Sequence, residues 1–185
     1  NQLTEWAGKF QRLFIKPDNN VQGTSCARFI SPLIDGRHIL PMAEMPFHAS
    51  GFQQIPANRQ SGLTVVFFVG CLIDKIFPSI AQAAVKVFKY HGVGVLCPED
   101  QGCCGIPALA SGDRESFESL TAHHLDLLKG LKFDYLVTAC ATCTSTIKKL
   151  WPALYQGKGS GTRAFVRELS EKTIDINQFL VNKLS

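Results

Sequence analysis

The amino-acid sequence predicts an α/β fold in which a parallel sheet is flanked by helices, in a Rossmann-like arrangement of three layers. From residue 63 onward, short runs rich in β-branched and aromatic residues alternate with segments of helical periodicity. Each run is separated from the next by enough chain for a crossover helix, an order typical of parallel strands with right-handed connections. Together these two observations predict the α/β class.

Three strands and three helices are expected to alternate along this part of the chain. The strands are short apolar runs at residues 63–70, 93–97 and 133–139. The helices that follow them are predicted at residues 78–92, 113–130 and 143–151. Glycines end the first two helices, and Pro152 is expected to end the third. Two further short helical patterns lie at residues 163–170 and 175–184.

The chain is expected to divide near residue 62. Residues 1–62 combine prolines with polar turn-forming stretches and contain one plausible helix, at about residues 2–14. They are predicted to form an irregular lead-in or connector segment. Residues 63–185 are predicted to form the α/β domain, and the chain is expected to be a fragment of a longer protein.

Composition and charge narrow the possible functions. The net charge of +4 is spread along the chain without a basic run, so a nucleic-acid partner is not indicated. The apolar run TVVFFVGCLI is well short of the roughly 20 residues that span a bilayer, so no transmembrane segment is predicted. No secretory signal is recognised at the start of the sequence.

The seven cysteines indicate metal binding or redox chemistry in a reducing, cytoplasmic compartment rather than a disulfide framework. Five of them follow the three predicted strands. Cys71 follows the first strand, Cys103 and Cys104 the second, and Cys140 and Cys143 the third. Because the carboxyl ends of parallel strands lie at one edge of a sheet, we expect these five thiols to gather there.

Local sequence suggests how these thiols are arranged. Gly102 and Gly105 flank the adjacent pair, and we expect them to allow left-handed or closely approaching backbone, with loop amides that donate to sulfur. Cys140 and Cys143 lie at the start of a predicted helix, whose dipole is expected to lower the pKa of both thiols.

An all-sulfur ligand set favours an iron-sulfur cluster or zinc over magnesium, calcium or manganese. Structural zinc and an ordinary cubane cluster each take four ligands, which leaves one thiol over. The surplus thiol favours an unusual cluster, or a cluster with a reactive cysteine beside it. Zinc binding and thiol-disulfide chemistry without metal remain as alternatives.

The segments FFVGC, QGCCGIPALASGD and CATC carry a family resemblance. From about residue 63 to residue 180, the sequence resembles the cysteine-rich CCG domain. This domain occurs in the catalytic subunit of heterodisulfide reductase and in the iron-sulfur subunits of glycolate oxidase, lactate-utilisation proteins and anaerobic glycerol-3-phosphate dehydrogenase. The resemblance implies a non-cubane four-iron four-sulfur cluster held by Cys71, Cys103, Cys104, Cys140 and Cys143. It also implies that this domain is the first of two CCG copies, since the family usually carries the domain twice.

The resemblance further implies a function. We expect an iron-sulfur electron-transfer domain of a flavin-linked 2-hydroxyacid (glycolate or lactate) or glycerol-3-phosphate oxidoreductase complex. Its expected partners are a flavoprotein subunit and further iron-sulfur domains, at the cytoplasmic face of the membrane if the complex associates there. Two alternatives are a disulfide-reducing module like that of heterodisulfide reductase and a zinc-stabilised structural or interaction domain.

Other residues are expected to have structural roles. Cys97 is expected to be a buried structural thiol, and Asp74 and Lys75 an exposed turn. Of the neighbouring His123 and His124, at most one should face inward, with a packing or surface role.

Overall fold

The computed structural model forms two compact units, which are described separately. The first unit comprises residues 1–52 and 72–79, and the second comprises residues 53–71 and 80–185. The domain boundary expected near residue 62 stays a prediction. The residues whose structure is described are 6–7, 9–17, 25–27, 39–52, 54–57, 62–157 and 160–184.

The second unit is built on a four-stranded, fully parallel sheet with the strand order β4-β3-β5-β6. Its strands are β3 (Thr64–Phe68), β4 (Gly94–Leu96), β5 (Tyr135–Thr138) and β6 (Thr173–Asp175). In the register, Val65 lies opposite Val95 on one side and Tyr135 on the other. The predicted parallel sheet is confirmed. Strand β6 was not predicted, because its three residues lie between two helical patterns.

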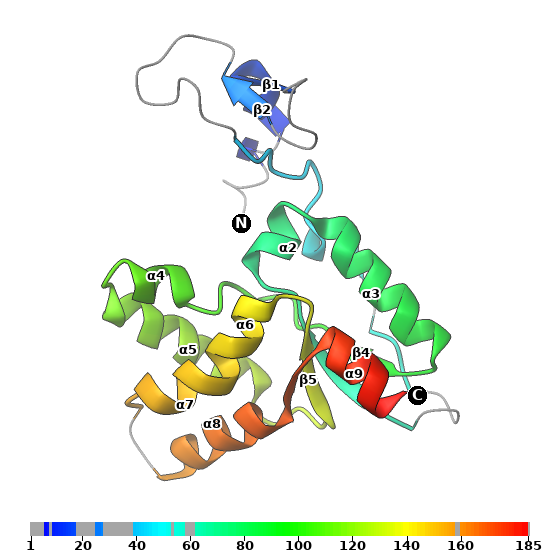
Figure 1. Ribbon diagram of the computed structural model, residues 1–185, viewed down its shortest axis with the longest axis vertical. Coiled ribbons are helices and arrows are strands. Elements are labelled where there is room, and N and C mark those ends of the chain that lie inside the picture. Colours follow the sequence, from blue (N-terminus) through cyan, green and yellow to red (C-terminus); the bar gives the residue numbers. More distant parts are fainter. Residues whose placement is uncertain are drawn as a thin grey trace. The chain divides into compact units, whose positions relative to one another are not determined.

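Helices cover both faces of this sheet and complete the predicted three layers. Helices α5, α6, α7 and α8 lie on one face, and α3 and α9 lie on the other (Figure 1). The α-helices whose bounds the structure describes are α2 (Cys71–Lys75), α3 (Pro78–Tyr90), α4 (Ile106–Ala110), α5 (Arg114–Leu128), α6 (Ala141–Ser145), α7 (Trp151–Leu154), α8 (Ser160–Lys172) and α9 (Ile176–Lys183).

Polar caps and special residues set the ends of these helices. Asp113 caps α5 by accepting a hydrogen bond from the Ser116 N–H, at 3.0 Å. Asp175 caps α9 in the same way, from the Asn177 N–H at 2.9 Å. Gly130 follows α5 with φ of +83°, a conformation that glycine adopts readily and that ends the helix as expected.

The helix that was expected to end before Pro152 continues through it, so that prediction is wrong. Between α6 and α7 lies a π-helical segment, η3 (Thr146–Leu150). Here the Trp151 N–H donates to the carbonyl of Thr146, which lies five residues earlier, whereas in an α-helix the acceptor lies four residues earlier. The wider turn accommodates a proline, which has no N–H to donate.

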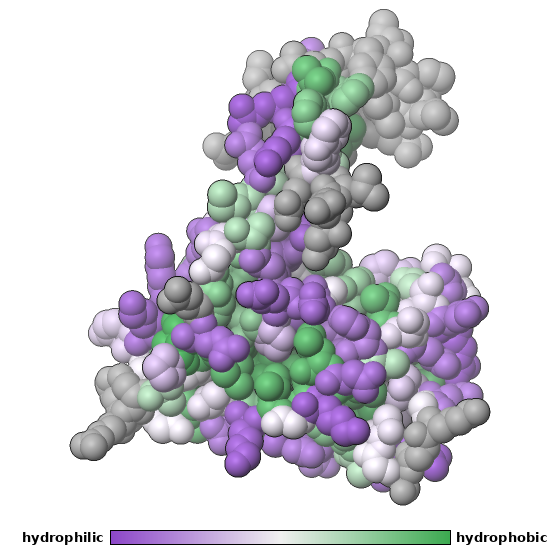
Figure 2. Space-filling model, turned by 180° about the vertical axis from the view of Figure 1, so that it is seen from behind, coloured by the Kyte–Doolittle hydropathy of each residue, from purple (hydrophilic) through white to green (hydrophobic). Residues whose placement is uncertain are grey.

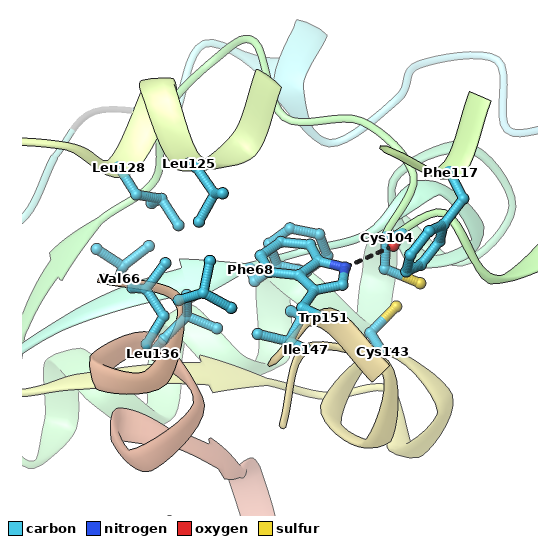
Figure 3. Close-up of a cluster of buried hydrophobic side chains, with 12 residues drawn as sticks. Val66, Phe68, Cys104, Phe117, Leu125, Leu128, Leu136, Cys143, Ile147 and Trp151 are labelled. Atoms are coloured by element: carbon cyan, nitrogen blue, oxygen red, sulfur yellow. Dashed lines mark hydrogen bonds between the residues drawn. The ribbon is translucent and has the colours of Figure 1, made fainter. Parts of the chain in front are cut away.

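Each face of the sheet packs a separate set of apolar side chains. On one face, Phe67 of β3 contacts Phe88 of α3, and Phe88 contacts Phe179 of α9, with ring centroids 5.6 and 5.9 Å apart. Val66 and Phe68 point to the other face. They join a fully or nearly buried cluster that Figure 3 shows, whose further members are Cys104, Phe117, Leu125, Leu128, Leu136, Cys143, Ile147, Trp151, Val166 and Leu169.

The first unit contains a short antiparallel pair, β1 (Ile15–Pro17) and β2 (Ser25–Ala27), after the 3₁₀ turn η1 (Gln11–Leu13). The helix expected at about residues 2–14 falls partly outside the described residues; residues 6, 7, 9 and 10 are helical. A second 3₁₀ turn, η2 (His48–Ser50), lies in the same unit. The main-chain N–H of Ala43 donates to the carbonyl of Lys75, at 2.7 Å, and so joins the two chain segments of this unit.

The surface is of mixed polarity. On the face in Figure 2, hydrophilic residues surround apolar ones rather than gathering into one block. Among the described residues, no helix is long and apolar enough to cross a membrane.

Candidate metal centre

The five cysteines that were predicted to gather lie at the carboxyl ends of three neighbouring strands. Cys71 begins α2, just after β3. Cys103 and Cys104 lie in the loop between β4 and α4. Cys140 is the N-cap of α6, just after β5, and Cys143 lies within that helix. The predicted position of the cysteines at this edge of the sheet is confirmed.

The five thiols form one continuous row. Hydrogen bonds between side chains join Cys71 to Cys103, Cys103 to Cys104, Cys104 to Cys143, and Cys143 to Cys140. Figure 3 shows the sulfur atoms of Cys104 and Cys143 facing each other. The outer end of the row is exposed at Cys71, whereas Cys104 and Cys143 are only 2% and 5% exposed. We call this arrangement the thiol row.

The central thiol of the row is held in its protonated form. Hydrogen bonds with Cys103 and Cys143, together with burial, raise the pKa of Cys104. Hydrogen bonds from Cys104 and then from Cys71 lower the pKa of Cys103. A hydrogen bond from Cys104 likewise lowers the pKa of Cys143. The row therefore pairs one proton-bearing thiol with two neighbours that favour the thiolate.

The pKa of Cys140 differs from the expectation. The helix dipole was expected to lower it, but burial raises it, and the hydrogen bonds from the amides of Cys143 and Thr142 do not compensate. That part of the prediction is wrong for Cys140, whereas the pKa of Cys143 is lowered, although chiefly by its bond to Cys104.

Main-chain amides donate to the sulfur atoms, as expected for the glycine-rich loop. The amide of Gly105 hydrogen-bonds the Cys103 sulfur, and the amide of Ile106 hydrogen-bonds the Cys104 sulfur. Such N–H donors stabilise thiolate and tune the potential of a bound cluster.

Two glycines allow close approach at the row. Gly105 has φ of +94°, and a Cβ atom there would lie 2.8 Å from Cδ2 of the buried Phe117. Gly70 has φ of +74°, and its Cβ would lie 3.0 Å from the Cys143 sulfur. Gly102 is not in the left-handed region, so that expectation holds only for Gly105.

Threonine hydroxyl groups fix the backbone of Cys140. The Thr138 hydroxyl accepts from the Cys140 N–H at 3.0 Å and donates to its carbonyl at 3.2 Å. The Thr144 hydroxyl donates to the same carbonyl at 3.1 Å. The backbone on both sides of this sulfur is therefore held in place at the start of α6.

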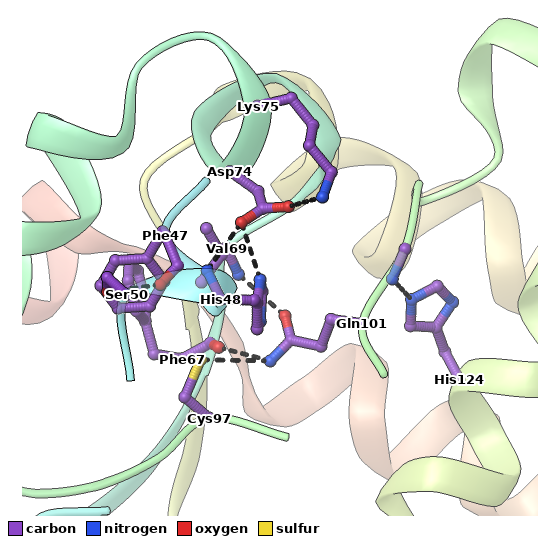
Figure 4. A network of polar contacts seen from close by, with 11 residues as sticks. Phe47, His48, Ser50, Phe67, Val69, Asp74, Lys75, Cys97, Gln101 and His124 are labelled. Carbon is purple, nitrogen blue, oxygen red and sulfur yellow. Dashed lines mark hydrogen bonds and ion pairs between the residues drawn. The ribbon is translucent and has the colours of Figure 1, made fainter. Parts of the chain in front are cut away.

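Gln101 anchors the cysteine loop to β3, a role that the sequence did not reveal. Its side-chain oxygen accepts from the Val69 N–H, and its Nε2 donates to the Phe67 carbonyl, both at 2.9 Å (Figure 4). Nε2 also lies 3.6 Å from the sulfur of Cys97, which is buried as predicted. The side-chain amide thus pairs with the end of the strand as a neighbouring backbone would.

Two buried rings bind the main chain of the same loop. The Gly102 N–H donates to Nε2 of His124 at 3.1 Å, and Nε1–H of Trp151 donates to the Cys104 carbonyl at 3.0 Å. Burial lowers the pKa of His124, so the ring is neutral and its Nε2 can accept. His124 alone of the two neighbouring histidines faces inward, as expected, but it does more than pack.

Asp74 and Lys75 do not form the exposed turn that was predicted. Asp74 is 5% exposed, and its carboxylate accepts from the His48 N–H, from Nδ1–H of His48 and from Nζ of Lys75, each at 2.9 Å (Figure 4). Asp74 was predicted to be exposed because its partner His48 lies 26 residues earlier and the local sequence does not reveal the contact.

The donor set of the row fits a metal cluster. It consists of sulfur alone, with no carboxylate within the row. In the described part of the chain, no three Cys, His, Asp or Glu side chains are grouped as one metal ion would require. Each thiol of the row has another thiol as its neighbour.

Sheet and thiol row together define an α/β domain with five cysteines at the carboxyl edge of a parallel sheet. Residues 65–148 match the family model of the cysteine-rich CCG domain. This stretch, which contains all five row cysteines, is similar to the CCG domain, as the resemblance implied.

Three relatives illustrate the similarity. An uncharacterized iron-sulfur protein of Methanocaldococcus jannaschii is 38% identical over 105 residues, 57% of this chain and 21% of that protein. A fumarate reductase (CoM/CoB) subunit of Methanothermobacter marburgensis is 32% identical over 127 residues, 69% of this chain and 23% of that protein. Lactate utilization protein A of an Exiguobacterium species is 32% identical over 120 residues, 65% of this chain and 48% of that protein. The chain spans less than half of the length of each.

Proposed function

We propose that the thiol row holds an iron-sulfur cluster and that the domain transfers electrons as part of a redox subunit. The observation that carries the proposal is the continuous contact of Cys71, Cys103, Cys104, Cys143 and Cys140, which come from three separate chain segments. The names of the relatives support it, since one is an iron-sulfur protein and another belongs to a fumarate reductase.

The arrangement of the thiols favours a cluster over zinc. A structural zinc ion needs four ligands around one point. The row offers five thiols, one more than a zinc ion takes, whereas a cluster has several separate iron atoms that each need a sulfur ligand. Five ligands also match the non-cubane four-iron four-sulfur cluster that the family resemblance implies, which we include in the proposal.

The residues of the chain contribute in distinct ways. The bound cluster would supply one-electron redox chemistry. The amides of Gly105 and Ile106 would stabilise its sulfur ligands, and the packed side chains around Cys104 and Cys143 exclude water from the middle of the row. The exposed Cys71 makes the outer end the side open to an electron partner.

The wider setting is part of the same proposal. We assign the domain to a flavin-linked 2-hydroxyacid or glycerol-3-phosphate oxidoreductase complex, with a flavoprotein and further iron-sulfur domains as partners. The similarity to lactate utilization protein A supports the hydroxyacid class. In this proposal residues 1–62 are the connector, residues 63–185 the first of two CCG domains, and the complex works in the cytoplasm or at its membrane face.

A set of cysteine variants tests the ligand assignment. Each of the five row cysteines is changed singly to serine, and Cys26→Ser, in strand β2 of the other unit, serves as the matched control. After anaerobic reconstitution, we expect each row variant to bind less iron and sulfide than the wild type, while the control binds as much. Wild-type iron and sulfide contents in the row variants would overturn the assignment. Circular dichroism checks that each variant is folded.

A further inference from the structure

Two main-chain groups at the ends of the Cys103–Cys104 pair form hydrogen bonds with buried rings. One is the N–H of Gly102, and the other is the carbonyl of Cys104. Each is bonded by a ring nitrogen from a different helix: Nε2 of His124 in α5 and Nε1–H of Trp151 in α7. Neither ring supplies a ligand to the thiol row.

The two rings are parts of one packed group. Their centroids are 5.8 Å apart, and both rings contact Phe68 of β3, at 5.1 Å for His124 and 6.5 Å for Trp151. All three side chains are fully buried. A shift of one ring therefore displaces the others, and water cannot easily replace either hydrogen bond.

The acceptor role of His124 is fixed by its own helix. Nδ1–H of His124 donates to the Leu120 carbonyl at 2.7 Å. This bond places the ring proton on Nδ1 and leaves the Nε2 lone pair directed at the Gly102 N–H. The ring can thus hold the loop only as a neutral acceptor.

Adjacent side chains on an extended backbone point to opposite sides, so a neighbouring pair of cysteines needs a fixed backbone to serve one row. Cys103 makes its further contact with Cys71, whereas Cys104 makes its own with Cys143. With the peptide groups at both ends held, the pair cannot rotate without breaking a buried hydrogen bond.

We propose that His124 and Trp151 act together as a positioning clamp that holds the Cys103–Cys104 pair and aims the Cys104 thiol into the row. The clamp belongs to the folded chain itself and operates whether or not metal is bound. Only its effect on a bound cluster rests on the function proposed above.

The test measures how fast each thiol of the reduced, metal-free chain reacts with iodoacetamide, by mass spectrometry of its peptides. His124→Leu removes the acceptor and Trp151→Phe removes the donor. Each should speed alkylation of Cys104 by about tenfold, the factor that loss of one ordinary hydrogen bond gives. His124→Gln supplies an acceptor near the position of Nε2 and should return the rate to within about threefold of wild type.

Two controls separate the clamp from general loosening. His91→Leu changes a ring that contacts Tyr90 after α3, at the opposite end of β4 from the cysteine loop, and should leave the rate at Cys104 unchanged. Hydrogen exchange of the amide of the buried Val137, in β5, reports global opening of the same unit. A rate at Cys104 that rises only in parallel with exchange at Val137, or that His124→Gln does not restore, would overturn the proposal.

A double variant tests whether the rings act together. If they form one clamp, His124→Leu combined with Trp151→Phe should speed alkylation by clearly less than the product of the two single effects. Independent, multiplicative effects would contradict a joint action. In reconstituted protein, the same single variants should shift the midpoint potential. A wild-type chain that binds no cluster would refute the proposed function but leave the alkylation result standing.

Discussion

The hydroxyl group of Ser170 donates a 2.7 Å hydrogen bond to the carbonyl oxygen of Lys148. In an uninterrupted α-helix, the N–H of the residue four positions later would bond this oxygen, but that residue is Pro152. Helix α8 thus supplies the donor that the proline lacks. The π-helical turn that accommodates the proline also sets the position of Trp151, whose ring reaches the Cys104 carbonyl.

This relationship predicts a coupling between Ser170 and Pro152. Ser170→Ala should lower the free energy of unfolding by about 0.5–1 kcal/mol, because the Lys148 carbonyl loses its donor. In the Pro152→Ala background the cost should be smaller, since a backbone N–H becomes available to that carbonyl. Urea unfolding of the four proteins measures both values. Equal costs in the two backgrounds would contradict this explanation of the π-helical segment.

Substitution by alanine should destabilise the fold more at Gly105 than at Gly112, which serves as the matched control. Both have positive φ, but a Cβ atom at Gly112 meets nothing within 4 Å, whereas one at Gly105 would meet Phe117 at 2.8 Å. Gly112→Ala should therefore cost only the backbone strain of about 1–2 kcal/mol. Gly105→Ala should cost a further 1–3 kcal/mol or so, because Phe117 is fully buried and cannot move freely. Denaturant unfolding that gives equal costs would refute the steric role of Gly105.

The buried carboxylate of Asp74 should make the stability of the fold depend on pH. Burial alone would raise the pKa of Asp74, but hydrogen bonds from the His48 side chain and backbone and from Lys75 outweigh it and hold the pKa far below its ordinary value. A lowered pKa in the folded state stabilises the fold above the unfolded pKa of about 3.9, and this contribution is lost as the pH falls below it.

Asp74→Asn should therefore lower the free energy of unfolding by about 1.5–3 kcal/mol at pH 7. The difference from wild type should shrink steadily between about pH 4.5 and pH 2.5. Urea unfolding across this range measures it. A difference that stays constant with pH would show that the charge of Asp74 does not stabilise the fold.

The two hydrogen bonds of the Gln101 side chain predict that Gln101→Glu, the substitution closest in shape, lowers stability. Gln101→Glu keeps an oxygen for the Val69 N–H but replaces the donor to the Phe67 carbonyl with a second acceptor. At neutral pH the carboxylate should destabilise the fold by about 1–3 kcal/mol. Urea unfolding measures this cost. An unchanged free energy of unfolding would mean that the hydrogen bond from Gln101 to the Phe67 carbonyl does not anchor the loop.

The position of the thiol row could be predicted from sequence, because strand order and cysteine position suffice to place side chains at one edge of a parallel sheet. Its supporting contacts could not. Gln101, His124 and Trp151 reach partners 22 to 47 residues away, and no local pattern marks such contacts. The same limit explains the error at Asp74, whose partner His48 is remote in sequence.

Two further errors have local causes. The helix dipole was expected to lower the pKa of Cys140. Burial acts in the opposite direction, and it prevails. The helix does not end at Pro152, although proline usually ends a helix. A π-helical turn makes room for the ring, and the Ser170 hydroxyl of α8 bonds the Lys148 carbonyl in place of the missing proline N–H.

The central claim is that the thiol row holds an iron-sulfur cluster. The most direct test is to count iron, acid-labile sulfide and zinc in the anaerobically reconstituted chain and to record its EPR spectrum in the oxidised and reduced states. We expect about four irons and four sulfides per chain, with a paramagnetic signal in one redox state that Cys104→Ala alters. One zinc ion per chain without sulfide would contradict the claim.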